Sequence, residues 1–527
     1  MLRQHAMARQ PVFSRGPAAS SAAPPGCWQH YGSGVTRSRA RALALAVVAT
    51  VLGVLASGAP ATTGAPAGAA VAAGAGDDGS LSAGAPGIGD PYFPLDGNGG
   101  IDVLAYDVHD RYRFGPRSLT GWTAVRLRTT AAVSSFDLDF LLPVRSVTVD
   151  GSAVPFDQAV PHELAVHRAA SAGEQLRVVV HYAGRPGAAG YDGERNWLAN
   201  AHEVVAMNEP HMAPWWFPAN DHPLDKATMT VAITAPRGDR VVACGRLVAR
   251  RVQGRLATTT WRSAQPMAPY LAFFAAGRFE VARGRIRGLP WYVAVSQRLP
   301  AAARRSTMDL LRRSPSIVRW LQGQLRTAYP FGSTGGLVTS LDPGFALENQ
   351  TRPTYPAGMA DAVTTEVHEL AHQWFGDSVS VAGWSDTWLN EGAATFMEVR
   401  WAETHGGPPA RAWLRRWYDD LPAGNDFWAH RVDDPCPTHQ GCVDSIFAWW
   451  VYQRGAMALQ ALRGVVGEAD FWAILQRWVT DHAGGNGSTA EFEALAAEVS
   501  GQDLGAFFDA WLHEPSKPPD TAALGLR

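Results

Sequence analysis

Apolar and polar residues alternate along short segments of the chain between residue 100 and about residue 285. Side chains on a strand point alternately to its two faces, so this pattern is typical of strands with one buried face. Turn residues separate the segments, which are 101–108, 123–127, 136–141, 144–149, 176–182, 229–234, 256–261 and 279–281. The pattern predicts an all-β N-terminal domain at residues 93–285.

The period changes to that of helices from about residue 290. The predicted helices are 304–325, 388–404, 412–419, 446–463, 471–482, 489–499 and 504–513. Pro315 must break or kink the first of them, because proline cannot donate the helical hydrogen bond. Ser488 is the expected N-cap of the helix that begins at residue 489. These elements predict an α+β protein with a second domain at 286–515 that ends in helices, followed by a tail at 516–527.

Two histidines and a glutamate within the helical part have the spacing of a metal site. On a helix, His368 and His372 lie on one face and can bind one metal ion. Glu369 then projects beside the metal, where its carboxylate can take a proton from water. Glu391 follows His372 after eighteen residues, which is enough to end one helix and begin another. The set predicts a catalytic zinc site with His368, His372 and Glu391 as ligands and a fourth position open for water.

The residues around this motif are strongly apolar. They include Val363, Val367, Leu370, Ala371, Trp374 and Phe375. A solvated helix with two unrelated histidines is the alternative interpretation, but an apolar helix is buried. Buried histidines and glutamates need partners, and a metal ion supplies them.

Several motifs resemble those of the M1 family of zinc aminopeptidases, which are gluzincins. Residues 368–377 read HELAHQWFGD and residues 388–392 read WLNEG. Residues 344–349 resemble the family's G-A-M-E-N exopeptidase motif, and residues 452–456 resemble its Y-x-[KR]-G-A segment. Glu209 precedes a segment similar to the family's F-P-C-F-D-E-P. The resemblance runs from about residue 95 to about residue 515 and implies a saddle-like β domain followed by a thermolysin-like catalytic domain in a two-domain form.

The resemblance also implies roles for individual residues. Tyr452 would donate its phenol hydrogen to the oxyanion formed during hydrolysis. Glu348 and Glu209 would bind the free α-ammonium of a peptide through charge-assisted hydrogen bonds. Taken without the motifs, Tyr452 is equally a core tyrosine, and the two glutamates are equally solvated loop residues.

Two departures from the family pattern concern substrate preference. Phe345 stands where the family has glycine, and Met207 stands where members often have glutamine. We expect both side chains to line the pocket for the first residue of the substrate. The backbone of Phe345, Ala346 and Leu347 is expected to run beside the substrate.

Two further acids are candidates to hold the histidines in place. Metal-bound histidines usually donate their other N–H to a carboxylate or a carbonyl. Asp377 follows His372 closely, and Glu398 lies seven residues after Glu391 on the same helix face. Either acid could instead form a structural ion pair.

The length, composition and net charge of the chain limit the number of its domains and the kinds of partner it can bind. The chain has 527 residues, 46% of them hydrophobic and 18% charged, with a net charge of −2. These values predict two or three globular domains, a monomer, and no nucleic-acid partner. The expected partners are peptides with a free N-terminus, and the expected cofactor is one zinc ion per chain. An endopeptidase, an epoxide hydrolase on the same scaffold and a non-catalytic binding module are the alternatives.

The N-terminal segment has the pattern of an export signal. Arginines precede an apolar run at 42–56, and small residues follow it. This predicts a signal peptide at 37–61, a secreted protein, and a disordered Ala/Gly/Pro linker at 62–92. Residues 1–36 are an unusual leader, so we expect translation to begin later, at Val35. A membrane anchor at 42–56 is the alternative, although about 20 apolar residues are needed to span a bilayer.

Four cysteines complete the sequence evidence. Cys436 and Cys442 lie six residues apart in a loop, which in an exported protein predicts a small disulfide ring. A second metal site is the alternative for this pair. Cys244 lies in an apolar stretch and is expected to be a buried thiol. Cys27 lies in the leader.

Overall fold

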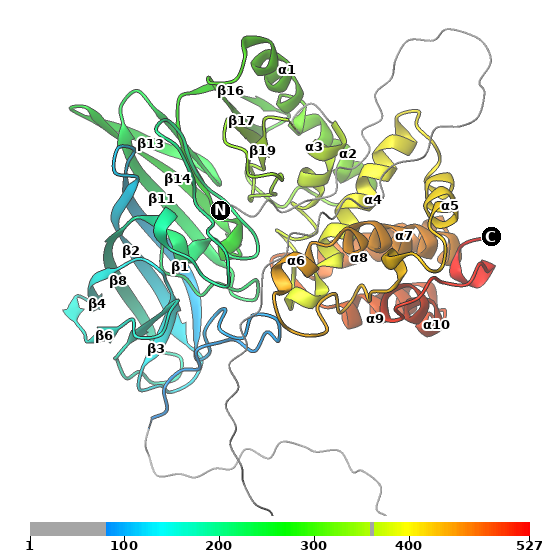
Figure 1. Cartoon of the computed structure of the whole chain (residues 1–527), viewed down its shortest axis with the longest axis horizontal. Helices are drawn as coiled ribbons and strands as arrows, with labels where there is room; N and C mark the ends of the chain where they lie inside the picture. The colour runs from blue at the N-terminus through cyan, green and yellow to red at the C-terminus, as the bar shows by residue number, and fades with distance from the viewer. Residues whose placement is uncertain (1–80, 359–362) are drawn as a thin grey trace, which may run out of the picture. The chain divides into compact units, whose positions relative to one another are not determined.

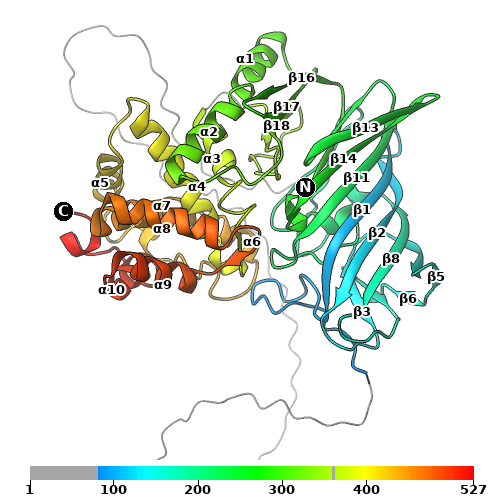
Figure 2. The same cartoon turned by 180° about the vertical axis from the view of Figure 1, so that it is seen from behind.

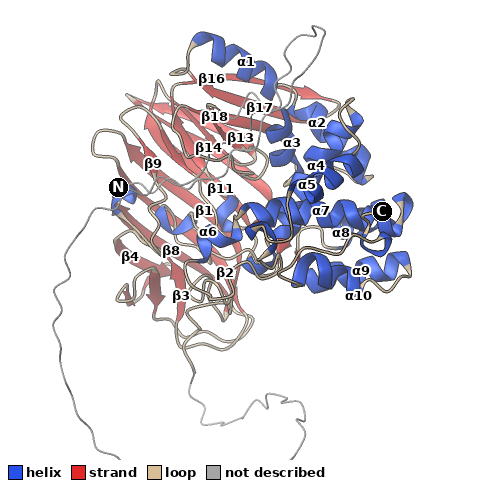
Figure 3. Cartoon of the chain, turned by 45° about the vertical axis from the view of Figure 1, so that its right-hand side comes forward, coloured by secondary structure: helices blue, strands red, loops and turns tan. Residues whose placement is uncertain are grey.

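A computed structural model describes residues 81–358 and 363–527 of the chain (Figure 1). The predicted leader, signal peptide and alternative anchor, as well as most of the predicted linker, lie outside these residues. Strands fill the N-terminal part and helices fill the C-terminal part, as the colouring of Figure 3 shows. The α+β class predicted from the sequence is therefore confirmed.

A large twisted sheet forms the N-terminal β region. Its eight strands follow the order β13-β14-β11-β1-β2-β8-β4-β5. Neighbours are antiparallel except β1 and β11, which are parallel. The strands are β1 (Ile101–Arg113), β2 (Ser118–Thr129), β4 (Val144–Val149), β5 (Ser152–Ala153), β8 (Gln175–Gly184), β11 (Ala227–Pro236), β13 (Arg246–Gln253) and β14 (Leu256–Met267).

Two smaller sheets complete the β region, and its core is apolar. One sheet has the order β12-β15-β10-β9, and the other has the order β3-β7-β6. The strands are β3 (Phe136–Asp139), β6 (Phe156–Asp157), β7 (Glu163–Val166), β9 (Leu198–Ala199), β10 (Val204–Ala206), β12 (Arg240–Ala243) and β15 (Phe274–Gly277). Valines, leucines and aromatic residues from these strands are buried together.

The catalytic region begins with a four-stranded sheet of order β16-β17-β18-β19. Its strands are β16 (Phe279–Ile286), β17 (Leu289–Ser296), β18 (Thr334–Thr339) and β19 (Thr354–Pro356). Because β16 pairs along its whole length with β17, this sheet begins at Phe279 and not at the predicted boundary of 286. Helices α1 (Ala301–Leu311) and α2 (Ser314–Leu325) follow β17, and Pro315 stands in the first turn of α2. The predicted break at Pro315 is therefore confirmed.

Helices make up most of the rest of this region (Figure 2), together with a short parallel pair of strands, β20 (Ser380–Val381) and β21 (Asn486–Gly487). Helix α4 packs against α3 and α7, and α8 packs against α7 and α9. Ser488 caps α9 in a reciprocal capping box with Glu491, as predicted. The helices are α3 (Val363–Ala371), α4 (Trp388–Thr404), α5 (Ala410–Asp420), α6 (Cys442–Ile446), α7 (Trp449–Val466), α8 (Glu468–Asp481), α9 (Thr489–Ser500) and α10 (Gly505–Phe508).

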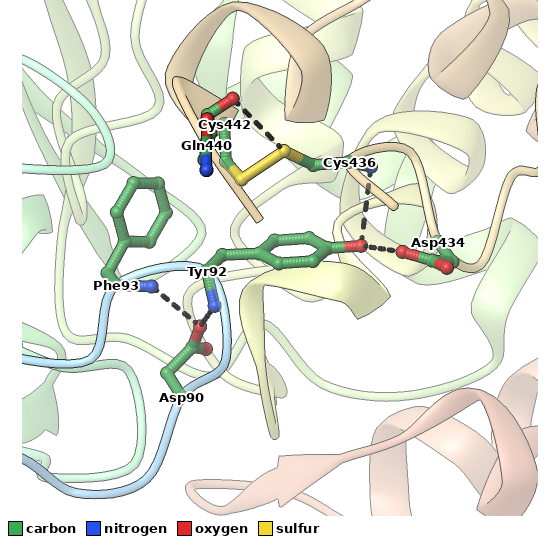
Figure 4. The surroundings of a disulfide bond; sticks show 7 residues. All are labelled: Asp90, Tyr92, Phe93, Asp434, Cys436, Gln440 and Cys442. Carbon is green, nitrogen blue, oxygen red and sulfur yellow. Dashed lines mark hydrogen bonds between the residues drawn. A yellow bond between two sulfur atoms is a disulfide. The ribbon is translucent and has the colours of Figure 1, made fainter. Parts of the chain in front are cut away.

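The segment before β1 joins the β region to a loop of the catalytic region (Figure 4). Asp90 accepts hydrogen bonds from the backbone of Tyr92 and of Trp384. The Tyr92 hydroxyl donates to Asp434, beside the disulfide between Cys436 and Cys442. Tyr92 is only 5% exposed, so the prediction of a disordered linker up to residue 92 is wrong for its last residues. Burial of the aromatic ring fixes this segment in place.

The predicted tail at 516–527 also packs on the catalytic region. Tyr418 donates a hydrogen bond to the carbonyl of Pro518, and Lys517 donates to two carbonyls at the end of α5. Leu524 and Leu526 are buried in the helical core. Across residues 81–358 and 363–527, every helix is too short or too polar to cross a membrane.

Candidate active site

Two helices bring the predicted metal ligands together. His368 lies on α3, His372 directly follows its last residue and donates its backbone N–H to the His368 carbonyl, and Glu391 lies in the first turn of α4, which packs against α3. Glu391 Oε2 is 3.1 Å from His368 Nε2 and 3.4 Å from His372 Nε2. The positive charge of the two histidines lowers the pKa of Glu391 to about 2 in spite of its burial. One imidazole nitrogen of each histidine therefore faces the same carboxylate oxygen.

The other nitrogen of each histidine has a partner that fixes the ring. His368 Nδ1 is 2.8 Å from Glu398 Oε1, and His372 Nδ1 is 3.0 Å from the carbonyl oxygen of Phe375. Glu398 thus occupies the supporting position expected from the sequence. Asp377 does not, because the turn after α3 presents the Phe375 carbonyl to His372, and the Asp377 carboxylate makes no hydrogen bond among the described residues.

This donor set fits a zinc ion. Bonds of about 2.0–2.2 Å in a tetrahedron place ligand atoms about 3.3–3.6 Å apart, close to the distances found here. With both Nδ1 atoms hydrogen-bonded, the Nε2 atoms are the ones free to bind a metal. Two imidazoles and one carboxylate leave a fourth position for a reactant, which is the pattern of catalytic and not structural zinc sites.

Glu369 lies beside the metal ligands on α3. Its side chain is buried, and burial raises the pKa of its carboxyl to about 8, with Glu348 and Glu391 adding to this effect and the two histidines opposing it. A buried carboxylate with a raised pKa is a stronger base than a solvated one. The arrangement suits Glu369 to exchange a proton with a reacting group.

Tyr452 lies on α7 against the first histidine. Its ring is nearly parallel to that of His368, with ring centroids 6.1 Å apart. Burial, with the charges of Glu391 and Glu209, raises the pKa of its hydroxyl above the usual value of 10. The phenol therefore stays protonated and can act as a hydrogen-bond donor at this site.

Glu348 and Glu209 reach the same site from different parts of the chain. Glu348 is 2% exposed, and its Oε1 atom has no hydrogen-bond partner among the described residues. Burial and then the charges of Glu348, Glu391 and Glu369 raise the pKa of Glu209. Two converging acids, one of them with an unpaired buried oxygen, are suited to a cationic group.

The segment before Glu348 has an irregular backbone, and its first residue is a glycine. Gly344 adopts φ +88°, which other residues rarely adopt. Phe345 packs against the core of the β region, and Ala346 packs against the β16–β19 sheet. Leu347 exchanges two backbone hydrogen bonds with Thr354 on β19. Met207 is 1% exposed within the β core, and its part in a substrate pocket stays a prediction.

Gln373 was not singled out from the sequence, although it follows His372 directly. Its Nε2 donates to the carbonyl of Glu348 at 2.8 Å, and its Oε1 accepts from the backbone N–H of Thr351 at 2.7 Å. The side chain therefore ties the segment of Glu348 to the end of the zinc helix. The signal in the sequence was an amide within an apolar, buried helix end, because a buried amide needs partners on both its atoms.

Lys226 and Tyr270 were also missed. Lys226 Nζ donates to the carbonyls of Asp377, Ser378 and Gly485, and burial lowers its pKa to about 7. It thereby fixes the turn after α3 from the β region. The Tyr270 hydroxyl is buried without a hydrogen-bond partner, and burial with the charges of Glu209 and Glu348 raises its pKa. Neither residue belongs to a sequence motif, so only its burial in the structure distinguishes it.

Known proteins are similar to this chain in sequence and in fold. The model of the peptidase family M1 domain matches residues 336–511. Aminopeptidase N of Streptomyces lividans is 32% identical over 212 residues, which cover 37% of this chain and 24% of that enzyme. Human glutamyl aminopeptidase is 28% identical over 335 residues, which cover 60% of this chain and 34% of that enzyme. The chain thus spans well under two thirds of the length of these relatives.

Solved structures match over a larger share of the chain. The crystal structure of the M1 zinc metallopeptidase from Deinococcus radiodurans has a TM-score of 0.72 and 29% identity, covering 82% of this chain and 98% of that one. A variant of the Deinococcus enzyme bound to a Tyr-Ser-Ala substrate has a TM-score of 0.71 and 28% identity. The fold matches that of zinc metallopeptidases, and the His-His-Glu group is suited to hold zinc. The chain carries a peptidase family M1 domain at residues 336–511, and its fold is similar to that of the two-domain M1 zinc metallopeptidases.

Proposed function

We propose that this protein is a zinc-dependent aminopeptidase that hydrolyses the N-terminal peptide bond of peptides. The observation that carries the proposal is the pair of acids Glu348 and Glu209 beside the His-His-Glu group. The charge of Glu348 raises the pKa of Glu209, and Glu348 is buried with an unpaired oxygen. A free α-ammonium supplies the positive charge and the donors that both carboxylates need.

The chemistry follows from the placement of each side chain. When bound, zinc polarises the scissile carbonyl and lowers the pKa of water at the site. Glu369 takes a proton from the attacking water and returns it to the leaving amine. The Tyr452 hydroxyl donates a hydrogen bond to the oxyanion that develops on the substrate. Glu398 and the Phe375 carbonyl keep the histidine rings oriented.

Recognition of the ammonium limits cleavage to the first residue of the chain. The two acids would obstruct any residue upstream of the cleaved bond, because buried carboxylates facing a neutral peptide lose their solvation without compensation. This favours an exopeptidase over the endopeptidase alternative. Phe345 and Met207 are our candidates for the pocket of the first side chain, and replacing either should reorder the preference among N-terminal residues.

A peptide with a free N-terminus should be cleaved one residue at a time, and its N-acetylated copy should resist cleavage. Acetylation removes the charge that Glu348 and Glu209 bind. The measurement is mass spectrometry of products from both peptides. Equal cleavage of the two at internal bonds would contradict the aminopeptidase assignment and favour the endopeptidase.

Replacing Glu348 with alanine should lower kcat/KM for free-amine substrates by the equivalent of about 1–3 kcal/mol. The zinc content should stay unchanged, because Glu348 is not a metal ligand in this arrangement. Glu366→Gln is a matched control, since Glu366 is another buried glutamate whose carboxylate accepts from Ser314. A zinc content that fell with Glu348→Ala would place this residue among the ligands instead.

Replacing Tyr452 with phenylalanine should lower turnover about 10²-fold with little change in KM, because only the oxyanion donor is lost. Steady-state kinetics measure this. Tyr418→Phe is the control: its hydroxyl donates to the Pro518 carbonyl, so this variant should lose stability and keep turnover. A Tyr452→Phe enzyme with normal turnover and reduced thermal stability would make Tyr452 a core tyrosine.

We also propose that the protein is exported. The support is the arginine-flanked apolar run at 42–56, followed by small residues, and the disulfide between Cys436 and Cys442. Disulfides persist in oxidising compartments. N-terminal sequencing of protein recovered from the medium tests this proposal, and an N-terminus before residue 42 would contradict signal cleavage.

A further inference from the structure

A second group of metal-binding side chains lies in the β region, outside the site described above. Asp139 ends strand β3, Glu163 begins strand β7, and His162 directly precedes it. The antiparallel register pairs Asp139 with Glu163. Like charges directly opposite each other on two strands are destabilising, and more so when buried. The pairing therefore needs a compensating group.

The polar atoms of this group lack hydrogen-bond partners among the described residues. Both nitrogens of His162, both carboxylate oxygens of Glu163 and one oxygen of Asp139 are buried without one. The three residues are between 0% and 4% exposed. Protonation alone does not resolve this, because a protonated acid or a neutral imidazole still has a buried donor that needs an acceptor.

The charge around the group is negative. Asp221 and Asp96 are also buried. After the effect of burial, the charges of Glu163 and Asp221 raise the pKa of Asp139, and those of Asp137 and Asp96 raise the pKa of Glu163. Every ion pair that the structure gives to these acids is with a histidine, and none is with arginine or lysine. A divalent cation would neutralise the group, as zinc does at the His-His-Glu site.

The geometry matches that of a metal site. His162 Nδ1 is 3.5 Å from Asp139 Oδ1 and 3.6 Å from Glu163 Oε1. The corresponding distances from Glu391 to the two catalytic histidines are 3.1 and 3.4 Å. In both groups the three ligand atoms lie within 4.8 Å of one another. The two distances from His162 Nδ1 are the spacings expected of atoms that share one tetrahedral ion.

We propose that Asp139, His162 and Glu163 bind a second divalent transition-metal ion that stabilises the β region. One imidazole and two carboxylates suit Zn²⁺ and ions of similar preference. Asp221 is the candidate fourth ligand, because one of its carboxylate oxygens is also buried without a partner and its backbone N–H donates to Asp139. Four protein ligands would close the site, which is the pattern of a structural metal.

Zinc content and metal position test the proposal. We expect full-length protein reconstituted with Zn²⁺ to hold two ions per chain by elemental analysis, and Glu163→Gln to hold one. Anomalous diffraction at the zinc absorption edge should give one peak at His368, His372 and Glu391 and a second at His162. A single peak, at the catalytic group alone, in crystals of the wild-type protein would overturn the proposal, whether or not the variant folds.

A matched control separates metal binding from the loss of a buried acid. Asp110 is also a buried aspartate, but it belongs to no metal-binding group among the described residues. Asp110→Asn should therefore keep two zinc ions per chain. In a His372→Ala background, adding Zn²⁺ should raise Tm, and the further change Glu163→Gln should abolish that rise. An equal rise in Tm with and without Glu163→Gln would contradict the assignment. This measurement does not depend on the proposed peptidase activity.

Discussion

Replacing Glu369 with glutamine should lower turnover by about 10²–10⁴-fold while the zinc content stays unchanged. An amide has nearly the shape of the carboxylate but cannot accept a proton from water, so only the acid–base step is lost. Glu369 lies next to His368 but outside the group of ligand atoms that could hold the metal. The measurement is steady-state hydrolysis of an aminoacyl amide, together with elemental analysis of the same sample.

Glu366→Gln provides the control for this variant. Glu366 lies on the same helix, is equally buried, and has a pKa that burial also raises to about 8. Its carboxylate accepts a hydrogen bond from Ser314, and Glu366 is not a member of the His368, His372 and Glu391 group. We expect this variant to keep its turnover. If Glu369→Gln instead removed zinc, Glu369 would be a ligand and not the base.

Replacing His372 with alanine should remove the zinc ion of the catalytic site and abolish measurable hydrolysis. Two remaining protein ligands hold zinc poorly, and Glu391 would lose one of the histidines that lower its pKa. Elemental analysis should show the loss of one zinc ion per chain, and activity assays should show no turnover above background. Dialysis of the wild-type protein against a chelator should give the same loss of activity.

His405→Ala is a suitable control, because His405 is exposed, stacks on Trp401 and belongs to no metal-binding group among the described residues. It should keep both zinc and activity. Full zinc content and normal turnover in His372→Ala would overturn the assignment of the catalytic site.

The helix of the metal site was predictable because its evidence is local. The spacing of His368 and His372 fixes their common face on any helix. The capping of α9 by Ser488 is local as well, and both partners of the capping box lie within four residues. The break before Pro315 follows from the chemistry of one residue. In each case the sequence contains the whole interaction.

Contacts between segments that are distant in the sequence were harder to predict. Asp377 and Glu398 were equal candidates to support the histidines, but only Glu398 bonds one of them. The choice depended on a turn of a few residues that places the Phe375 carbonyl next to His372. The segment at 81–92 has the composition of a linker at its start, and yet Tyr92 is held by Asp434, which lies 342 residues away.

The sequence by itself determined the class of the elements, the helix of the His-His-Glu group and the candidate ligands of the metal. Tertiary structure alone decided which buried polar side chains contact one another. Gln373 bonds the segment of Glu348, Lys226 holds the turn after α3, and the register of β3 and β7 sets Asp139 opposite Glu163. The physical reason is that these contacts depend on the packing and strand register of whole elements, which are the sum of many weak interactions. Helical spacing and capping depend only on residues a few positions apart in the sequence.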